Sequence, residues 1–423
     1  MVKRYSNSSV FIAAIICIIL FYSGLVKAAD KNKFSSMFPT AQIEMLKGSL
    51  ISSPVKTSDG NYYSARMKIC SVRAKNGALS DALGNVQVFI PATAVEAFFP
   101  GKLYSKAVAE TFSYACLWEA GGIYTVNGSF NKTQDKFYIE SCINSYFPQT
   151  VAGRLDYIRA LCRLQFKRLM FSWGIAGGLL LALLCGAKEY TSSEISLCFK
   201  NAGLSHILAL SGMHLSMFSG IAVFFGNRIG RKKLTFIIHI IALVLFVWFA
   251  GFSPSLLRAF LCNLLLIIAA LANVKKPDML LILAFSFLCH TVISPQDLFN
   301  SGFILSYSAL AGILLTNSFF NRLYSRFMPK YFAASLGSST GAQIFTAPVS
   351  LKLFGSFAPI GIIATAFVSP VVTLFIYSGL LLIVLSLMFP LLAGPSGFFI
   401  NLQYTVINYL VSFFSKGYIW RIN

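Results

Sequence analysis

Long apolar runs occupy most of the chain beyond residue 168, and each approaches the length that crosses the hydrocarbon core of a membrane. Proline interrupts two of them, at Pro348 and Pro370. Such interruptions are tolerated in lipid only where the backbone is buried in protein or lines a cavity. The pattern predicts an α-helical polytopic membrane protein of channel or transporter type over residues 169–423. The apolar runs are 169–187, 203–226, 234–252, 255–274, 278–293, 298–320, 332–354, 357–369, 371–388 and 398–414.

A further apolar run covers residues 10–26, after Lys3 and Arg4. Small residues in a cleavage-like arrangement follow at Val26-Lys27-Ala28. Residues 1–28 are therefore expected to be either a signal peptide or a first transmembrane anchor. Both interpretations place the segment that follows outside the cytoplasm.

Residues 29–149 are polar and alternate like β-strands. Tyr63, Ala65, Met67 and Ile69 are separated by polar side chains, and residues 86–90 repeat the pattern. Turn sequences stand at 59–61, 75–77 and 127–129. This segment is expected to form a small extracytoplasmic β domain, and a five-stranded barrel fits its length.

Basic residues recur in the next segment, residues 150–168. Arg159, Arg163 and Lys167 are spaced four residues apart, and apolar side chains occupy the opposite arc of the expected helix. The pattern predicts a basic amphipathic helix in the membrane interface. Its basic face would pair either with lipid phosphates or with a nucleic acid.

Three basic loops, at 228–233, 275–276 and 322–330, are expected on the cytoplasmic side of the inner membrane. If 169–187 enters from outside, residues 203–226 must turn back within the membrane to keep these loops together. A re-entrant segment is therefore predicted there. Residues 154–168 then lie outside, against the positive-inside rule, and an extra hidden crossing would remove both conflicts.

Composition narrows the possible functions. The chain has 423 residues, of which 56% are hydrophobic and 12% charged, with a formal net charge of +21. Beyond residue 168 the only acids are Glu189, Glu194, Asp278 and Asp297. Too few carboxylates are present there for catalysis by acidic residues, so the chain is not expected to be an enzyme. The basic excess indicates topology signals, affinity for anionic lipid or a polyanionic substrate.

The nine cysteines form no Cys-x-x-Cys pair and have no histidine cluster beside them, so neither a metal site nor a cofactor is expected. Cys70, Cys116 and Cys142 lie in the segment assigned outside the cytoplasm. An oxidising compartment would permit one disulfide among them and leave one thiol over. The sequence does not choose the pair.

Residues 203–226 are unusually polar for a membrane segment, with His206, Ser211, Gly212 and His214 close together. Two histidines without carboxylate or thiolate partners make a poor metal site. Helix-to-helix hydrogen bonding or the lining of a pore is the favoured interpretation.

Four motifs in this order resemble those of the ComEC competence-protein family. Ser-His-Ile-Leu-Ala-Leu-Ser-Gly-Met-His at 205–214 resembles its signature. Segments 251–259 and 297–307 resemble the second and third motifs, and 342–348 with 354–359 the fourth. Ile304 and Thr365 depart from the residues common in the family.

The resemblance implies a channel that passes single-stranded DNA across the cytoplasmic membrane during natural transformation, with an OB-like β domain outside. It also implies other competence proteins as partners: a DNA receptor, a cytoplasmic motor and a separate nuclease, because no His-x-His-x-Asp-His array occurs here. Membrane lipid and another copy of the chain are further expected partners. Seven aromatic residues are available for stacking on bases, unless most are barrel core: Tyr62, Tyr63, Phe89, Tyr104, Tyr114, Trp118 and Tyr138.

Arg258 is expected about one helical turn inside the outer surface, where it either snorkels to headgroups or contacts phosphate at the mouth of the pore. In this hypothesis the strand passes the three basic residues of 150–168 and then Arg258. It continues through a cavity formed around His206, Ser211, His214, Ser306 and Gln343. The alternatives are a small-solute or anion transporter and a non-transporting scaffold.

Overall fold

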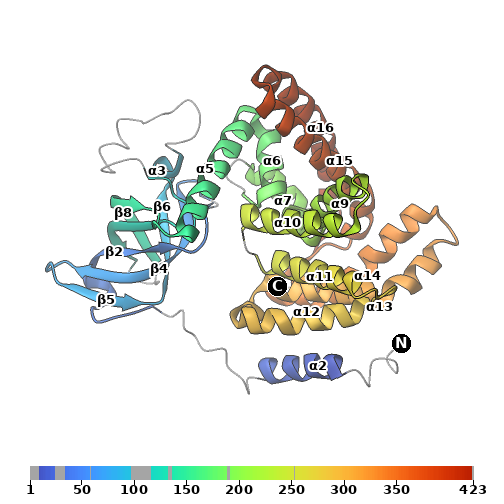
Figure 1. The fold of residues 1–423 in the computed structure, drawn as a ribbon, viewed down its shortest axis with the longest axis horizontal. Coiled ribbons are helices and arrows are strands. Elements are labelled where there is room, and N and C mark those ends of the chain that lie inside the picture. The colour runs from blue at the N-terminus through green and yellow to red at the C-terminus, as the bar shows by residue number, and fades with distance from the viewer. Residues whose placement is uncertain are drawn as a thin grey trace.

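The computed structural model describes residues 9–23, 34–57, 59–96, 116–131, 136–187, 191–251 and 253–421. A β-barrel near the N-terminus stands beside a larger helical part (Figure 1). The predicted fold class, a helical membrane protein with a small N-terminal β domain, is confirmed at this level.

The barrel closes through five strands in the order β2-β4-β6-β8-β7-β2. All neighbours are antiparallel except β6 and β8, which are parallel. A closed five-stranded Greek-key barrel is the architecture of the OB fold. Its strands are β2 (Ile43–Leu50), β4 (Tyr62–Ala74), β6 (Asn85–Pro91), β7 (Ile123–Phe130) and β8 (Lys136–Tyr146). Shorter elements extend it: β1 (Ser35–Ser36), β3 (Val55–Lys56), β5 (Leu79–Leu83) and α3 (Ala92–Glu96).

The core of the barrel follows the predicted alternation. Tyr63, Ala65, Met67 and Ile69 are almost fully buried, while the alternate residues between them face outward. The strand register shifts at Gly48 and Gly128. A side chain at either glycine would collide with a carbonyl of the neighbouring strand, so both positions need glycine to bend the sheet into a barrel.

The helical part begins with α2 (Ser9–Tyr22), which packs against α12, and resumes after the barrel. Among the described residues, four helices contain segments long and apolar enough to cross a membrane: Lys233–Ala250, Pro254–Leu271, Ser301–Tyr324 and Gly361–Met388. The remaining bounds are α5 (Val151–Ser172), α6 (Gly174–Cys185), α7 (Ser193–Asn201), α8 (Ser205–Leu208), α9 (Gly212–Arg228), α10 (Lys232–Ala250), α11 (Pro254–Leu271), α12 (Met279–Ile293), η2 (Pro295–Phe299), α13 (Ser301–Tyr324), α14 (Lys330–Phe354), α15 (Gly361–Met388) and α16 (Ala393–Ser415).

The predicted membrane run 169–187 is divided between two helices. The chain turns at Gly174, which has a φ of 65°, and α6 follows as a helix of 12 residues. At 1.5 Å per residue it is about 18 Å long, shorter than the hydrocarbon core. Every residue from 176 to 185 is buried. Since α5, α8, α15 and α16 contact it, α6 is a protein-enclosed helix and not a lipid-facing span.

The predicted re-entrant segment 203–226 is not one continuous helix. It contains the short α8, a break at 209–211, and then α9, which runs beside α10. Gly226, near the far end of α9, packs against Thr235 in the first turn of α10. The chain therefore turns between α9 and α10, and a reversal within the membrane at 203–226 stays a prediction.

The helices continue through both internal prolines. Pro348 lies inside α14, and Pro370 lies inside α15, which joins the two apolar runs predicted on either side of it. The expectation that these prolines break the helices is wrong. Helices in apolar surroundings tolerate proline where neighbouring helices and side chains satisfy the freed backbone groups.

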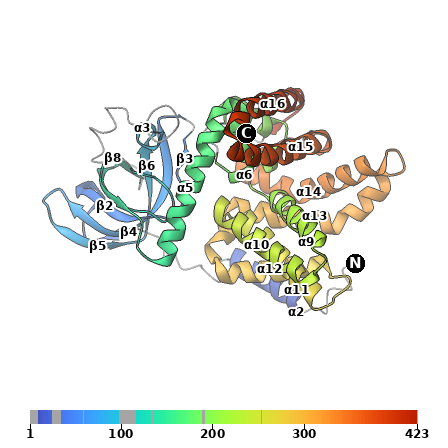
Figure 2. The same cartoon turned by 45° about the horizontal axis from the view of Figure 1, so that its top comes forward.

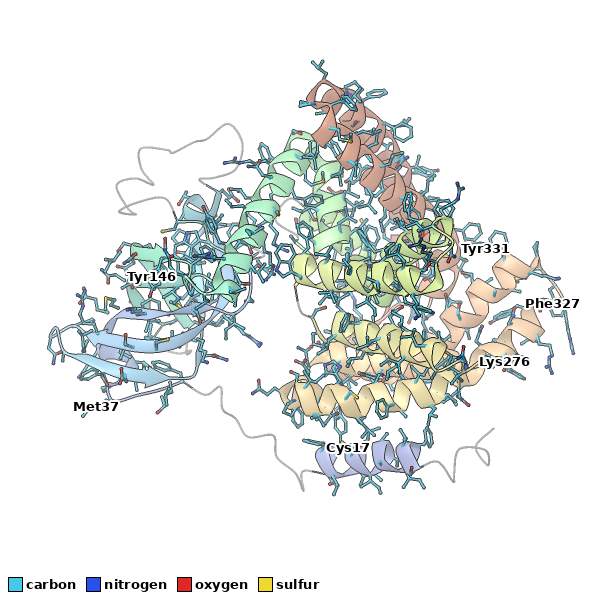
Figure 3. The ribbon with its side chains drawn as sticks, viewed as in Figure 1. Cys17, Met37, Tyr146, Lys276, Phe327 and Tyr331 are labelled. Atoms are coloured by element: carbon cyan, nitrogen blue, oxygen red, sulfur yellow. The ribbon has the colours of Figure 1, made fainter. Side chains whose placement is uncertain are left out.

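The two basic loops at 275–276 and 322–330 lie at the end of the helical part away from the barrel, as the positions of Lys276 and Phe327 show (Figure 3). The loop between α9 and α10 lies away from the barrel as well, because the opposite end of α10 contacts α5. Lys3, Arg4 and residues 26–28 are outside the described residues.

Candidate functional site

The first and second motifs meet where α9 begins. The helix break leaves the Leu210 carbonyl without a helical partner, and the Ser255 hydroxyl donates to it at 2.7 Å. The hydroxyl of Ser253 caps the start of α11, accepting from the Leu256 amide at 3.4 Å, and Pro254 occupies the first turn. These contacts fix the start of α11 on the broken segment.

Arg258 joins the first three motifs. One Nη donates to the carbonyl of Ser306 at 2.8 Å. The other lies against Gly212, where an added Cβ would be only 3.1 Å away. Its Nε is buried and has no hydrogen-bond partner among the described residues, and within that same set no carboxylate pairs with it. The guanidinium is therefore a largely enclosed cation held by a backbone carbonyl.

His214 caps the helix on which it lies. Its Nδ1 is 3.3 Å from the Ser211 amide and 3.2 Å from the Ser211 hydroxyl, which closes the first turn of α9. The Nε2 atom is buried and lacks a partner in the described part of the chain. His206 is exposed on α8, before the break. The structure shows a capping role for His214 and assigns none to His206.

Gln343 of the fourth motif lies at a close contact between two glycines. Its Nε2 would be 2.7 Å from a Cβ added at Gly361, and the Cα of Gly203 would be 3.1 Å from the same point. Its Oε1 is buried and unpaired within the described ranges. The fourth motif therefore meets the loop before the first, while Gly212, Arg258 and Ser306 form a second group.

A buried cluster that the sequence interpretation missed anchors the third motif. His290 Nε2 is 3.1 Å from Asp297 Oδ2, and its Nδ1 is 3.3 Å from the Tyr307 hydroxyl. The hydrogen bond from His290 lowers the pKa of the Asp297 carboxyl, and the charge of Arg66 on the barrel contributes in the same direction. The sequence did offer one signal for this cluster, because Asp297 is one of only four acidic residues beyond residue 168.

The basic residues of α5 face inward. Arg163 and Lys167 lie 3.3 and 3.2 Å from one carboxyl oxygen of Glu119, and all three side chains are buried. Arg163 also donates to the Phe249 carbonyl at 2.9 Å, at the end of α10. α5 thus bridges the barrel and the helices, between which it runs (Figure 2).

Burial alone would raise the pKa of the Glu119 carboxyl. The charges of Arg163 and Lys167 and a hydrogen bond from Ser53 outweigh it and lower the pKa to about 2. The carboxylate is therefore ionised at neutral pH and neutralises part of the basic cluster.

Residues 150–168 were expected to present a basic face to lipid phosphates or to a nucleic acid. The structure corrects this expectation, because Arg163 and Lys167 on that face are buried. Two cations can be buried because a carboxylate pairs with them. Arg159 is partly buried, with one Nη against Gly251. The side of α5 that faces outward is largely apolar, with Leu155, Ile158 and Leu161 exposed.

The candidate stacking residues separate into two groups. Tyr63 and Trp118 are buried in the barrel. Tyr62, Phe89 and Tyr138 are partly exposed on its outside. Tyr104 and Tyr114 lie outside the described residues.

The cysteines of the barrel are brought together as one pair. The Sγ atoms of Cys116 and Cys142 are 3.2 Å apart in the core, and Cys70 is exposed. Within the described ranges, no group of three or more histidine, cysteine or acidic side chains could hold a metal ion.

Apolar helices of membrane length, an enclosed central helix and an N-terminal five-stranded barrel define a polytopic membrane protein with an added barrel domain. Residues 183–422 match the model of the competence protein family, and the chain belongs to that family.

Two curated relatives are similar over about half of the chain. ComE operon protein 3 of Bacillus subtilis (strain 168) is 27% identical over 208 residues, which are 48% of this chain and 25% of that protein. An uncharacterized protein of Aquifex aeolicus (strain VF5) is 26% identical over 240 residues, 56% of this chain and 53% of the relative. The match therefore spans only a quarter to a half of these relatives. No solved structure matches.

Proposed function

We propose that this protein conducts single-stranded DNA across the cytoplasmic membrane during DNA uptake. Membership of the competence protein family supports the process. The barrel supports the substrate, because OB folds commonly bind single strands. In this proposal the chain performs no catalysis, and a receptor, a nuclease and a cytoplasmic motor are separate proteins.

The observation that carries the proposal is Arg258. A buried guanidinium with an unpaired Nε and no carboxylate partner among the described residues is costly, and such residues in membrane proteins mark substrate pathways. Phosphate oxygens accept hydrogen bonds from guanidinium in a bidentate manner. The contact with Gly212 holds the guanidinium where the first three motifs converge.

The position of the charges supports an orientation with the barrel outside. The basic loops around Lys276 and Phe327 lie opposite the barrel (Figure 3). Cytoplasmic loops are enriched in Lys and Arg. With the barrel outside, an incoming strand meets the barrel first and Arg258 afterwards, because the start of α11 adjoins the end of α10 that contacts α5.

The test uses a strain that naturally imports DNA. The gene for this protein is deleted from it, and the deletion is complemented with wild type or a variant. Surface binding of labelled duplex and arrival of label in the cytoplasm are measured separately for wild type, Arg258→Gln and the control Arg154→Gln, which removes an exposed arginine at the start of α5. Arg258→Gln is expected to lower cytoplasmic arrival at least tenfold, because loss of a charge-assisted phosphate contact removes about 1.5–3 kcal/mol. Surface binding and protein level should stay normal.

Three results would contradict the proposal. Unchanged arrival in the deletion strain favours a small-solute transporter or a non-transporting scaffold. Normal arrival with Arg258→Gln at wild-type protein level removes Arg258 from the DNA path. A loss as large with Arg154→Gln would mean that uptake responds to any lost positive charge.

A further inference from the structure

Three aromatic side chains gather on the outside of the barrel, on neighbouring strands. Tyr62, Phe89 and Tyr138 come from β4, β6 and β8, and we call them the outer aromatic face. Phe89 is paired with Tyr138 in the parallel register, with ring centroids 4.9 Å apart and planes 15° apart. The Tyr62 ring meets Tyr138 edge-on at 5.4 Å. The inward-facing neighbours form the core, so these three rings are not needed to fill it.

Cations border the outer aromatic face. Strand register places Arg66, Gln87 and Lys136 in a row directly beside the row of Ser64, Phe89 and Tyr138. The Lys136 ammonium is 5.8 Å from the centroid of the Phe89 ring. Arg66 is exposed, as is Lys68 two residues further along β4.

Opposing charge on this side of the barrel is limited. Glu140, two residues beyond Tyr138, is exposed and accepts a hydrogen bond from Ser129 at 3.3 Å. The charge of Arg66 also acts on the Asp297 carboxyl of the helical part and contributes to the lowering of its pKa. The combination of rings and cations is complementary to a strand of bases and phosphates.

We propose that the outer aromatic face, with Arg66, Lys68 and Lys136, is the site at which single-stranded DNA is first captured. This deepens the proposed function and rests on it. Stacking on aromatic rings accepts any base, since each has a π-face, and requires bases that are not enclosed in a duplex. The face of the corresponding strands is where OB folds bind oligonucleotides. Each row also contains a polar residue, Gln87 beside the cations and Ser64 beside the rings, and the hydrogen bond between these two argues against a lipid-binding surface.

The test measures binding of a short fluorescent oligothymidylate to the full-length protein in detergent, by anisotropy. Phe89→Leu with Tyr138→Leu removes both stacked rings but keeps apolar volume, and is expected to weaken binding at least about tenfold. Tyr138→Phe keeps the ring and should retain wild-type affinity. Tyr146→Leu, at the exposed end of β8, is the matched control and should bind normally.

The cations are tested by salt dependence. Lys136→Gln should reduce the slope of log affinity against log salt concentration by about 0.7, the value for one lost phosphate contact on a single strand. Lys47→Gln, exposed on β2, should leave the slope unchanged. A labelled duplex of the same length should bind more weakly than the single strand.

Unchanged affinity in the Phe89→Leu, Tyr138→Leu double variant overturns the capture site, as does equal binding of duplex. A loss as large with Tyr146→Leu also overturns it. The two proposals fail separately. Normal binding by the ring variants, with import blocked by Arg258→Gln, removes the capture site and leaves the channel. Weakened binding by the ring variants, with import unchanged in the deletion strain, keeps the capture site and removes the channel.

Discussion

At the scale of single residues, the partner of each buried charge decides what the charge does. Arg163 and Lys167 share Glu119 and are thereby structural, whereas Arg258 has a backbone carbonyl and an unpaired Nε among the described residues. A buried cation with a carboxylate is largely satisfied, and one without it retains the capacity to bind an anion. The same residue type therefore serves two purposes in one chain.

Protonation of Glu119 should lower the free energy of unfolding at acidic pH. Its pKa falls from an ordinary 4.5 to about 2 on folding, so its contribution is complete above pH 4.5 and is lost as the pH falls toward 2. Glu119→Gln leaves two buried cations without their carboxylate and should lower the free energy of unfolding at neutral pH by about 3–5 kcal/mol. Denaturant unfolding in detergent, between neutral pH and pH 2, measures both effects.

Glu96→Gln provides the comparison. Glu96 pairs with Lys56 at 2.6 Å, but both side chains are partly exposed, so its loss should cost about 0–1 kcal/mol. If Glu119→Gln costs no more than Glu96→Gln, or retains the decline of the wild type between pH 4.5 and 2, Glu119 does not hold α5 in the way described.

The inward direction of α5 was beyond sequence-based prediction. The spacing of Arg159, Arg163 and Lys167 correctly indicates one helical face, but Glu119 lies 44 residues before Arg163, and spacing carries no information about such a partner. Arg258 was identified from its motif and its place near the start of an apolar run. The contact with Ser306 could not be identified, because it depends on how α11 and α13 pack.

At the scale of elements, two glycines of α9 offer matched positions. A Cβ at Gly212 would lie 3.1 Å from an Arg258 Nη atom, whereas a Cβ at Gly220 meets nothing within 4 Å. A side chain at Gly212 would therefore require the guanidinium to shift by a few tenths of an ångström, whereas Gly220 is an ordinary helix position.

Gly212→Ala is therefore expected to displace the Arg258 side chain and to reduce DNA arrival in the cytoplasm severalfold. Gly220→Ala should leave arrival unchanged and stabilise α9 by up to about 1 kcal/mol, because alanine favours helix more than glycine does. Uptake assays and thermal unfolding of both variants measure this. Equal uptake by the two variants would show that the close approach at Gly212 has no role in transport.

Periodicity predicted the strands better than the membrane helices. Alternation identified the inward residues of β4 and β6, because each strand has one face in the core. Hydropathy treated 169–187 as a span, since it records apolar character and not whether lipid or protein surrounds the helix. It also divided α15 at Pro370, where the helix continues.

At the scale of the whole molecule, the barrel and the basic loops occupy opposite ends (Figure 3). With the barrel outside, an impermeant maleimide should label Leu79→Cys in intact cells, but Lys276→Cys and Phe327→Cys only after permeabilisation. Leu79 is 69% exposed and Phe327 80% exposed, so access is not limited by burial. Cys70→Ser and Cys162→Ser form the background, because both native thiols are exposed. Labelling of Lys276→Cys in intact cells would refute this orientation.

The enclosure of α6 constrains the order in which the protein can be assembled. Its walls include α15 and α16, at residues 361–415, which leave the ribosome long after α6 does. During synthesis the apolar surface of α6 has no such neighbours, and a helix of about 18 Å is too short to remain stably across the bilayer alone. Biogenesis must therefore hold α6 in a provisional place, such as an insertase or the membrane interface, until the C-terminal pair arrives to enclose it.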